Sequence, residues 1–217
     1  MTSEEVAHIK LPILALPVGS CEQHGPHLPL GTDTMIAEHL CEVLSIYHPR
    51  VVIGPSLTVT SSGEHEGFPG TLSIGRPATT SVIVELVRSA NWASSVVLVN
   101  GHGGNSEVVR HAVSTLRGES RNVTDWWPRS TGDAHAGHVE TSIMLHIAPD
   151  LVVHDRVEVG DMRPLQEIAD ALRSGGVRSV SPNGVLGDPR AASKAEGELL
   201  IARFAQELID HVSAEHR

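Results

Sequence analysis

The alternation of short apolar runs with helical patterns constrains the fold of this chain more than any other feature. Apolar runs predict buried strands at residues 11–18, 51–59, 95–99 and 122–127. Helical spacing follows at residues 35–47, 80–92, 106–118, 139–148, 164–173 and 192–212. Such alternation favours an α/β fold, a three-layer α/β/α sandwich around a mainly parallel sheet. In sheets of this kind, ligand sites gather where the strands end at their carboxyl termini.

Length and charge limit the classes of function. A chain of 217 residues suits a single domain over 1–217. Sixteen Lys and Arg against 26 Asp and Glu give a formal charge of −10, which argues against nucleic-acid and membrane partners. The acidic first residues do not resemble a signal peptide, and the apolar runs are too short to span a bilayer. With Cys21 and Cys41 as the only cysteines, a cytoplasmic protein with free thiols is expected.

A dense group of potential ligands, GSCEQHGPHLPLGTDT at 19–34, follows the first predicted strand. If the chain stays extended from Glu22 to His24, these side chains point the same way, so a carboxylate and an imidazole converge. Asp33 lies at the expected start of a helix. It could cap that helix or face a shared metal ion, and local sequence leaves both possibilities open.

The segment NGHGGN at 100–105 joins a predicted strand to a predicted helix. A glycine-rich turn in this place could bind phosphate at the helix N-terminus. However, the Walker lysine is absent and the spacing is not GxGxxG. His102 within the turn therefore favours metal binding over phosphate binding.

The third group, DAHAGHVETS at 133–142, places His135 and His138 before a predicted helix that contains Glu140. Alone, this pattern fits an exposed loop with a helix-favouring glutamate. Together with the other two loops it completes a His/Asp/Glu site for a divalent cation. GxSxG and HExxH motifs are absent, so a site assembled across several loops is expected.

Four motifs in order, PVGSCEQHGPHLPLGTDT, HEGFPGT, NGHGGN and HAGHVETS, resemble the creatininase (creatinine amidohydrolase) family over most of the chain. The resemblance implies an α/β/α homo-oligomer with a divalent metal site that is often binuclear. It places Glu22 and His102 on one metal, His24 on the second, and Asp33 between them. Creatininase completes the second site with a glutamate after its turn histidine, where this chain has glycines. Glu140 is the replacement candidate, and the difference argues against creatinine as substrate.

Within that family, GDAHAGHVETSIMLH and SPNGVLGDP are most similar to the members that process the mycofactocin precursor peptide. The resemblance implies a metal-dependent amide hydrolase that releases a modified C-terminal Val-Tyr dipeptide unit. The alternatives are a small-amide hydrolase, such as a formamide deformylase in flavin-type cofactor biosynthesis, and a non-catalytic nucleotide or phosphate binder. One or two Fe(II) or Zn(II) ions per chain would suit the ligands.

Roles for the remaining residues follow from the resemblance and from chemistry. Two cations held a few ångströms apart can activate water and polarise the scissile carbonyl. His135 is the candidate for proton transfer to the leaving nitrogen, with Glu140 as an alternative base. The candidates for substrate binding are Glu64, His65, Gly103 and His138.

Overall fold

A parallel sheet forms the centre of the protein. The computed structural model describes residues 1–129 and 132–215, so Ser130 and Thr131, shortly before the group at 133–142, lie outside the described residues. Within the described part the sheet has four strands in the order β2-β1-β3-β4, all parallel. They are β1 (Ile13–Val18), β2 (Val51–Ile53), β3 (Ser95–Asn100) and β4 (Val123–Trp126). The predicted parallel α/β sheet is confirmed.

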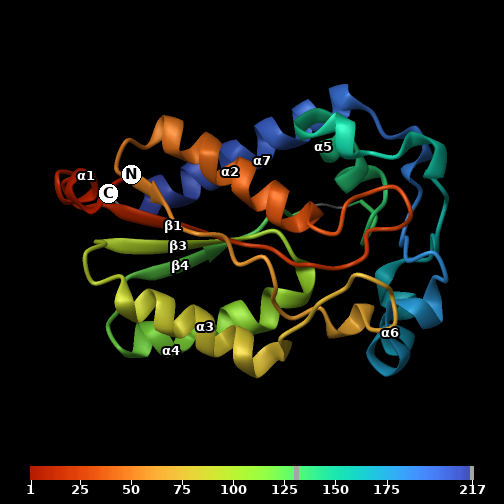
Figure 1. The fold of residues 1–217 in the computed structure, drawn as a ribbon, viewed down its shortest axis with the longest axis horizontal. Coiled ribbons are helices and arrows are strands. Elements are labelled where there is room, and N and C mark those ends of the chain that lie inside the picture. The colour runs from red at the N-terminus through yellow and green to blue at the C-terminus, as the bar shows by residue number, and fades with distance from the viewer. Residues whose placement is uncertain (130–131, 216–217) are drawn as a thin grey trace.

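Helices cover both faces of this sheet (Figure 1). One face carries α2 (Thr32–Tyr47), α5 (His138–Ile147) and α7 (Lys194–Glu215), and the other carries α3 (Gly75–Ser89) and α4 (Ser106–Gly118). The short α1 (Ser3–Ala7) precedes β1, and α6 (Leu165–Val180) lies beyond the carboxyl ends of the strands. The three layers are those expected from the sequence. None of the helices described here is both long and apolar enough to cross a membrane.

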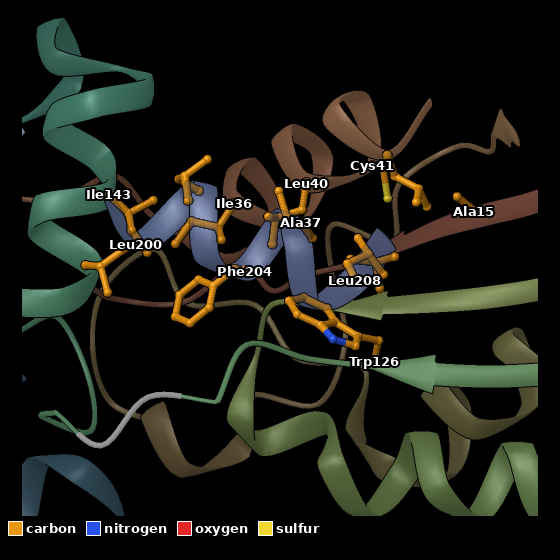
Figure 2. Close-up of a cluster of buried hydrophobic side chains, with 14 of the residues drawn as sticks. Ala15, Ile36, Ala37, Leu40, Cys41, Trp126, Ile143, Leu200, Phe204 and Leu208 are labelled. Atoms are coloured by element: carbon orange, nitrogen blue, oxygen red, sulfur yellow. The ribbon is translucent and has the colours of Figure 1, made fainter. Parts of the chain in front are cut away.

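Side chains alternate along β1 between two hydrophobic cores. Ile13 and Ala15 belong to the core beneath α2 and α7, whereas Leu14 and Leu16 face α3 and α4. Figure 2 shows the first core, in which Phe204 of α7 lies with side chains of α2 and β4. Complete burial of a side chain of this size contributes about 1.5–3 kcal/mol. Both faces of the sheet are therefore committed to packing, and polar chemistry is left to the ends of the strands.

Some element boundaries differ from the predicted ones. The predicted strand 51–59 is wrong beyond Ile53. Gly54 still donates a backbone hydrogen bond to Ala15, but Pro55 has no N–H to donate, and an isolated bridge joins Leu57 to Val18. The helix expected at 80–92 occupies Gly75–Ser89 instead, with Pro77 tolerated in its first turn. The helix expected at 164–173 continues to Val180 through a break at Gly176, whose φ is 67°.

Candidate metal centre

Glu22 lies just beyond β1 and is fully buried. Its Oε1 is 3.2 Å from His65 Nε2, and its Oε2 is 3.2 Å from His102 Nε2. Neither oxygen has a hydrogen-bond partner of acceptable geometry among the described residues. A buried carboxylate without such partners carries a large desolvation cost, so this position calls for a positive charge beside it.

Asp33 stands between two histidines. Its Oδ1 is 3.1 Å from His24 Nε2, and its Oδ2 is 3.1 Å from His102 Nδ1. The Ser20 hydroxyl donates a hydrogen bond to Oδ2 at 2.7 Å. The helix-cap interpretation is wrong, because Asp33 lies inside the first turn of α2 and the N-cap is Gly31. The side chain is turned away from the helix backbone and into the cluster.

A close approach of two chain segments makes this geometry possible. A Cβ on Gly101, the residue after β3, would lie 2.2 Å from the backbone oxygen of Asp33. Only glycine leaves room for the end of β3 to touch the start of α2. His102, one residue later, is thereby brought against the Asp33 carboxylate.

The backbone determines which ring nitrogen carries the proton in these histidines. His24 Nδ1 lies 3.0 Å from the carbonyl oxygen of Glu22, and His102 Nε2 lies 3.1 Å from that of Ser61. A carbonyl oxygen can only accept, so each of these nitrogens is the donor. In a neutral ring, the opposite nitrogen then presents a lone pair to an Asp33 oxygen. Lone pairs facing carboxylates repel each other unless a cation lies between them.

The charges of the cluster also indicate that a cation belongs among its carboxylates and histidines. Burial alone would lower the pKa of His24, but the carboxylates of Asp33, Glu140 and Glu22 outweigh it and raise the pKa to about 10. Burial likewise opposes ionisation of Glu22, yet His102 lowers the pKa of that carboxyl to about 2. Without a cation, protonated histidines must balance the buried carboxylates. A metal ion would replace those protons.

Glu140 enters the cluster from the first turn of α5. Its side chain is 22% exposed, and its Oε2 lies 3.9 Å from His24 Nε2. The same oxygen accepts a hydrogen bond from the backbone N–H of Ala136 at 2.6 Å. Asp133 accepts hydrogen bonds from the N–H groups of His138 and Val139, which holds the start of the helix in place.

Two sets of side chains could therefore each hold a metal ion, and Asp33 belongs to both. Within each set, the potential ligand atoms lie within 4.8 Å of one another. One set is Glu22, Asp33 and His102, and the other is His24, Asp33 and Glu140. A third combination joins His135 to Glu22 and His24. The unpartnered oxygens of Glu22 and the opposed lone pairs show that this cluster fits divalent cations of mixed imidazole and carboxylate preference.

His135 is buried beside the cluster. Its Nε2 donates a hydrogen bond to the carbonyl oxygen of Gln23 at 2.7 Å, so the lone pair of the neutral ring is on Nδ1. That nitrogen lies 3.8 Å from Glu22 Oε1. Burial, followed by the nearby His24 and His65, holds the pKa of His135 well below its usual value. His135 is thus placed as a neutral proton acceptor.

A cavity of about 1000 Å³ opens onto the cluster. His102 and Glu140 line it, together with the predicted substrate residues Gly103 and His138. His65, the third of these, is buried against Glu22 instead of in the cavity wall. The fourth predicted residue, Glu64, also lies outside the described lining, with its Oε1 3.5 Å from His102 Nε2.

The glycine turn beside this cavity is poorly suited to phosphate. A Cβ on Gly104 would lie 1.9 Å from Glu64 Oε1, so a carboxylate occupies the space that an anion would need. Glu22 and Asp33 are close by and carry the same charge. Like charges at these distances disfavour an anionic ligand.

Sequence reasoning missed the residues that orient the cluster. They are Ser20, which bonds Asp33, Ser61, whose carbonyl accepts from His102, and Gln23, which contacts His65 and His135. Gln23 had a usable signal, because it stands between two candidate ligands, Glu22 and His24. The two serines had none, since their partners are distant in sequence.

Comparisons with known proteins agree with the resemblance seen in the sequence. The sequence model of the creatininase family, described as creatinine amidohydrolase, matches residues 1–212. A mycofactocin precursor peptide peptidase of Mycolicibacterium smegmatis is 48% identical over 213 residues, which cover 94% of this chain and 86% of the relative. A creatinine amidohydrolase of Pseudomonas putida is 27% identical over 235 residues, covering 94% and 89%.

Solved structures show the same fold. A creatininase crystal structure superposes with a TM-score of 0.87 at 24% identity, covering 99% of this chain and 95% of the other. A structure described as the manganese form of creatininase gives a TM-score of 0.84 at 26% identity, covering 99% and 96%. The family match over nearly the whole chain and the close relatives agree with the geometry of the cluster. The chain belongs to the creatininase family.

Proposed function

We propose that this protein is a metal-dependent peptidase that cleaves the modified mycofactocin precursor peptide. One observation carries the proposal: the Asp33 carboxylate directs one oxygen to His24 and the other to His102, within two overlapping ligand sets. The relative at 48% identity, which carries the name of that peptidase, supports the choice of substrate. Membership of the creatininase family supports hydrolysis of an amide C–N bond.

In this proposal, Asp33 bridges two divalent ions. Glu22 and His102 complete one site, and His24 and Glu140 complete the other, with Glu140 in place of the glutamate that the glycine turn lacks. When bound, two such ions supply an activated water and polarise the scissile carbonyl. The carboxylates of Glu22, Asp33 and Glu140 would hold the ions in a largely buried place, where electrostatic effects are strong.

Proton transfer falls to His135 in this arrangement. Its Nδ1 is unprotonated in the neutral ring and faces the cluster, while Nε2 is occupied by the Gln23 carbonyl. His135 can take a proton at Nδ1 during attack on the carbonyl and return it from that atom to the leaving nitrogen. Glu140 is the alternative base, because burial raises its pKa to about 7. As a metal ligand, it would not be free for that role.

The cavity suits a peptide end better than a single small amide. Its volume of about 1000 Å³ lies at the upper end for small-molecule sites. Its lining includes the apolar side chains of Trp127 and Leu186 as well as Gly103 and His138, so it can receive an apolar side chain and a peptide backbone together. The proposed product is the modified C-terminal Val-Tyr dipeptide unit.

Further properties belong to the same proposal. Iron(II) or zinc would suit the mixed ligands. The free thiols of Cys21 and Cys41 are compatible with a cytoplasmic enzyme. The family match over residues 1–212 supports one metallohydrolase domain over 1–217, of which 216–217 lie outside the described residues. We also propose a homo-oligomer, as the family resemblance suggests.

Mass spectrometry of the enzyme with a modified precursor peptide tests this function. The expected result is release of the Val-Tyr unit in the untreated protein, loss of release after chelation, and recovery when iron(II) or zinc is returned. An unmodified precursor of the same length serves as the substrate control. Hydrolysis of a formamide without release of the Val-Tyr unit would assign the protein to small-amide chemistry instead.

A further inference from the structure

The amide of Gln23 lies at the centre of the site without contacting the cavity. Gln23 is 5% exposed and stands between the candidate ligands Glu22 and His24. Its Oε1 accepts a hydrogen bond from the backbone N–H of Gly25 at 2.8 Å. Because an N–H can only donate, this contact settles which end of the amide is oxygen. The NH₂ group must then face the other way.

The NH₂ group of Gln23 has two hydrogens and two available acceptors. Its Nε2 is 2.8 Å from His65 Nδ1 and 3.1 Å from the carbonyl oxygen of Gly184. His135 Nε2 is also 3.1 Å away, but that nitrogen already donates to the Gln23 carbonyl and cannot accept. The amide is thus fully satisfied in one orientation only.

This orientation has a consequence for His65. If His65 Nδ1 accepts from Gln23, the hydrogen of the neutral ring must be on Nε2. His65 Nε2 lies 3.2 Å from Glu22 Oε1, one of the two carboxylate oxygens with no hydrogen-bond partner of acceptable geometry among the described residues. With the Nε2–H of His65 facing Oε1 of Glu22, the other oxygen of Glu22, Oε2, faces His102.

The turn at 181–190, SPNGVLGDPR, supplies the other acceptor. Gly184 has a φ of +83°, and a Cβ there would lie 1.9 Å from Gln23 Oε1. Two residues on, Leu186 exchanges backbone hydrogen bonds with His135, donating to its carbonyl at 2.8 Å. The turn therefore contacts two residues of the site from behind, and glycine is the residue that lets it approach the amide.

We propose that Gln23 is a positioning residue, which the Gly184 turn holds in place and which sets His65 as the Nε2–H tautomer facing Glu22. This assigns a role to Gly184 in the 181–190 turn, from which the proposed function uses Leu186 alone, as part of the cavity lining. The role as a positioning residue rests on Glu22 being a metal ligand, as in the proposed function. The tautomer of His65 does not depend on that function and can be measured by itself.

The test is long-range ¹H–¹⁵N NMR of the histidine rings in the metal-free protein, which distinguishes the two tautomers. We expect His65 in the Nε2–H form in the wild type. In Gln23→Met, which keeps the length of the side chain but removes the donor, we expect a mixture of tautomers. Gly184→Ala should shift the His65 signals in the same direction, because the added methyl displaces the amide.

Matched controls separate positioning from general damage. Gln206→Met removes an exposed amide that bonds Asp210 on α7, and Gly75→Ala adds a methyl at a φ of +75° where the nearest atom lies 4.0 Å away. Both should leave the His65 signals unchanged. Metal affinity, measured by competition with a chelator, should fall by up to roughly 10-fold in Gln23→Met, the lower end of the loss for a direct partner of a ligand, because Gln23 acts on Glu22 through His65.

Three results would overturn the inference: Nδ1–H on His65 in the wild type, unchanged His65 signals in Gln23→Met, or unchanged metal affinity in that variant. If Gln23→Met does not fold, the wild-type spectrum and the spectrum of Gly184→Ala still test the tautomer of His65 and its dependence on the turn. A precursor peptide that is not cleaved, together with the expected tautomer, would count against the proposed function and leave the positioning role intact.

Discussion

The two ligand sets that share Asp33 are built in different ways. Glu22 and His102 lie in the loops that follow the neighbouring strands β1 and β3, and their side chains are 0% and 5% exposed. On the other side, Glu140 comes from the start of α5 and is 22% exposed. Strand ends in a parallel sheet are held by backbone pairing on both sides, whereas a helix start depends on the loop before it. The Glu22 set should therefore bind its metal more tightly than the Glu140 set.

Replacing Asp33 should have the largest effect, because it removes the ligand that both sets share. We expect Asp33→Ala to lose both metal ions and to reduce kcat/KM by about 10³-fold or more, equivalent to about 4 kcal/mol. Elemental analysis and the precursor assay measure the two losses. Asp170→Ala, an exposed residue on α6, is the control. Full metal content in Asp33→Ala would remove Asp33 from the bridging role.

The next largest effects should separate the two sets. Glu22→Gln should weaken the tighter site, and Glu140→Gln should cost one metal ion while leaving that site filled. The reason is that each variant removes one carboxylate charge from a different set. Elemental analysis of the two variants after identical dialysis compares them. Equal losses in both would show that the two halves of the site are equivalent.

Ser20→Ala should have a smaller effect that reaches both sets through Asp33. The variant loses the hydrogen bond at 2.7 Å to Asp33 Oδ2 without removing a ligand. Loss of such a partner typically reduces metal affinity by roughly 10–100-fold. Chelator competition measures the change, with the half-buried Ser45→Ala on α2 as control. If Ser20→Ala binds metal as tightly as the wild type, the position of Asp33 on α2 is enough to orient its carboxylate.

Glu64→Gln should have the smallest effect. Its carboxylate is 31% exposed and lies 3.5 Å from His102 Nε2, so solvent weakens the interaction. We expect less than about a threefold change in metal affinity, the range of an exposed ion pair. A loss as large as that of Ser20→Ala would place Glu64 among the residues that hold the metal.

The difference between the two sets also explains how far the sequence could predict the site. The strands and their order of appearance are encoded in the apolar runs, and these put the 19–34 and 100–105 loops at one edge of the sheet. The third loop made Glu140 a candidate from the sequence alone, but its place beside His24 came from the family resemblance, because nothing local links the start of α5 to His24. For a similar reason, the sequence left open whether Asp33 caps the helix or faces a metal ion. An aspartate in a first turn looks the same in sequence whether it faces the backbone or a neighbouring strand.

Contacts made by residues distant in sequence account for what sequence analysis could not predict. Gln23 contacts His65, His135 and Gly184, which come from three separate segments. Local propensity cannot encode such contacts, because they appear only when the whole chain is folded. The end of β2 at Ile53 has a local cause instead: Gly54 and Pro55 follow directly and outweigh the apolar pattern that continues beyond them.

Titration of the metal-free protein with zinc, followed by calorimetry, tests the central claim most directly. A site bridged by Asp33 with unequal halves predicts two binding steps of different affinity in the wild type. It also predicts that the tighter step alone remains in Glu140→Gln. A single step of one ion per chain in the wild type, unchanged in Glu140→Gln, would contradict the account.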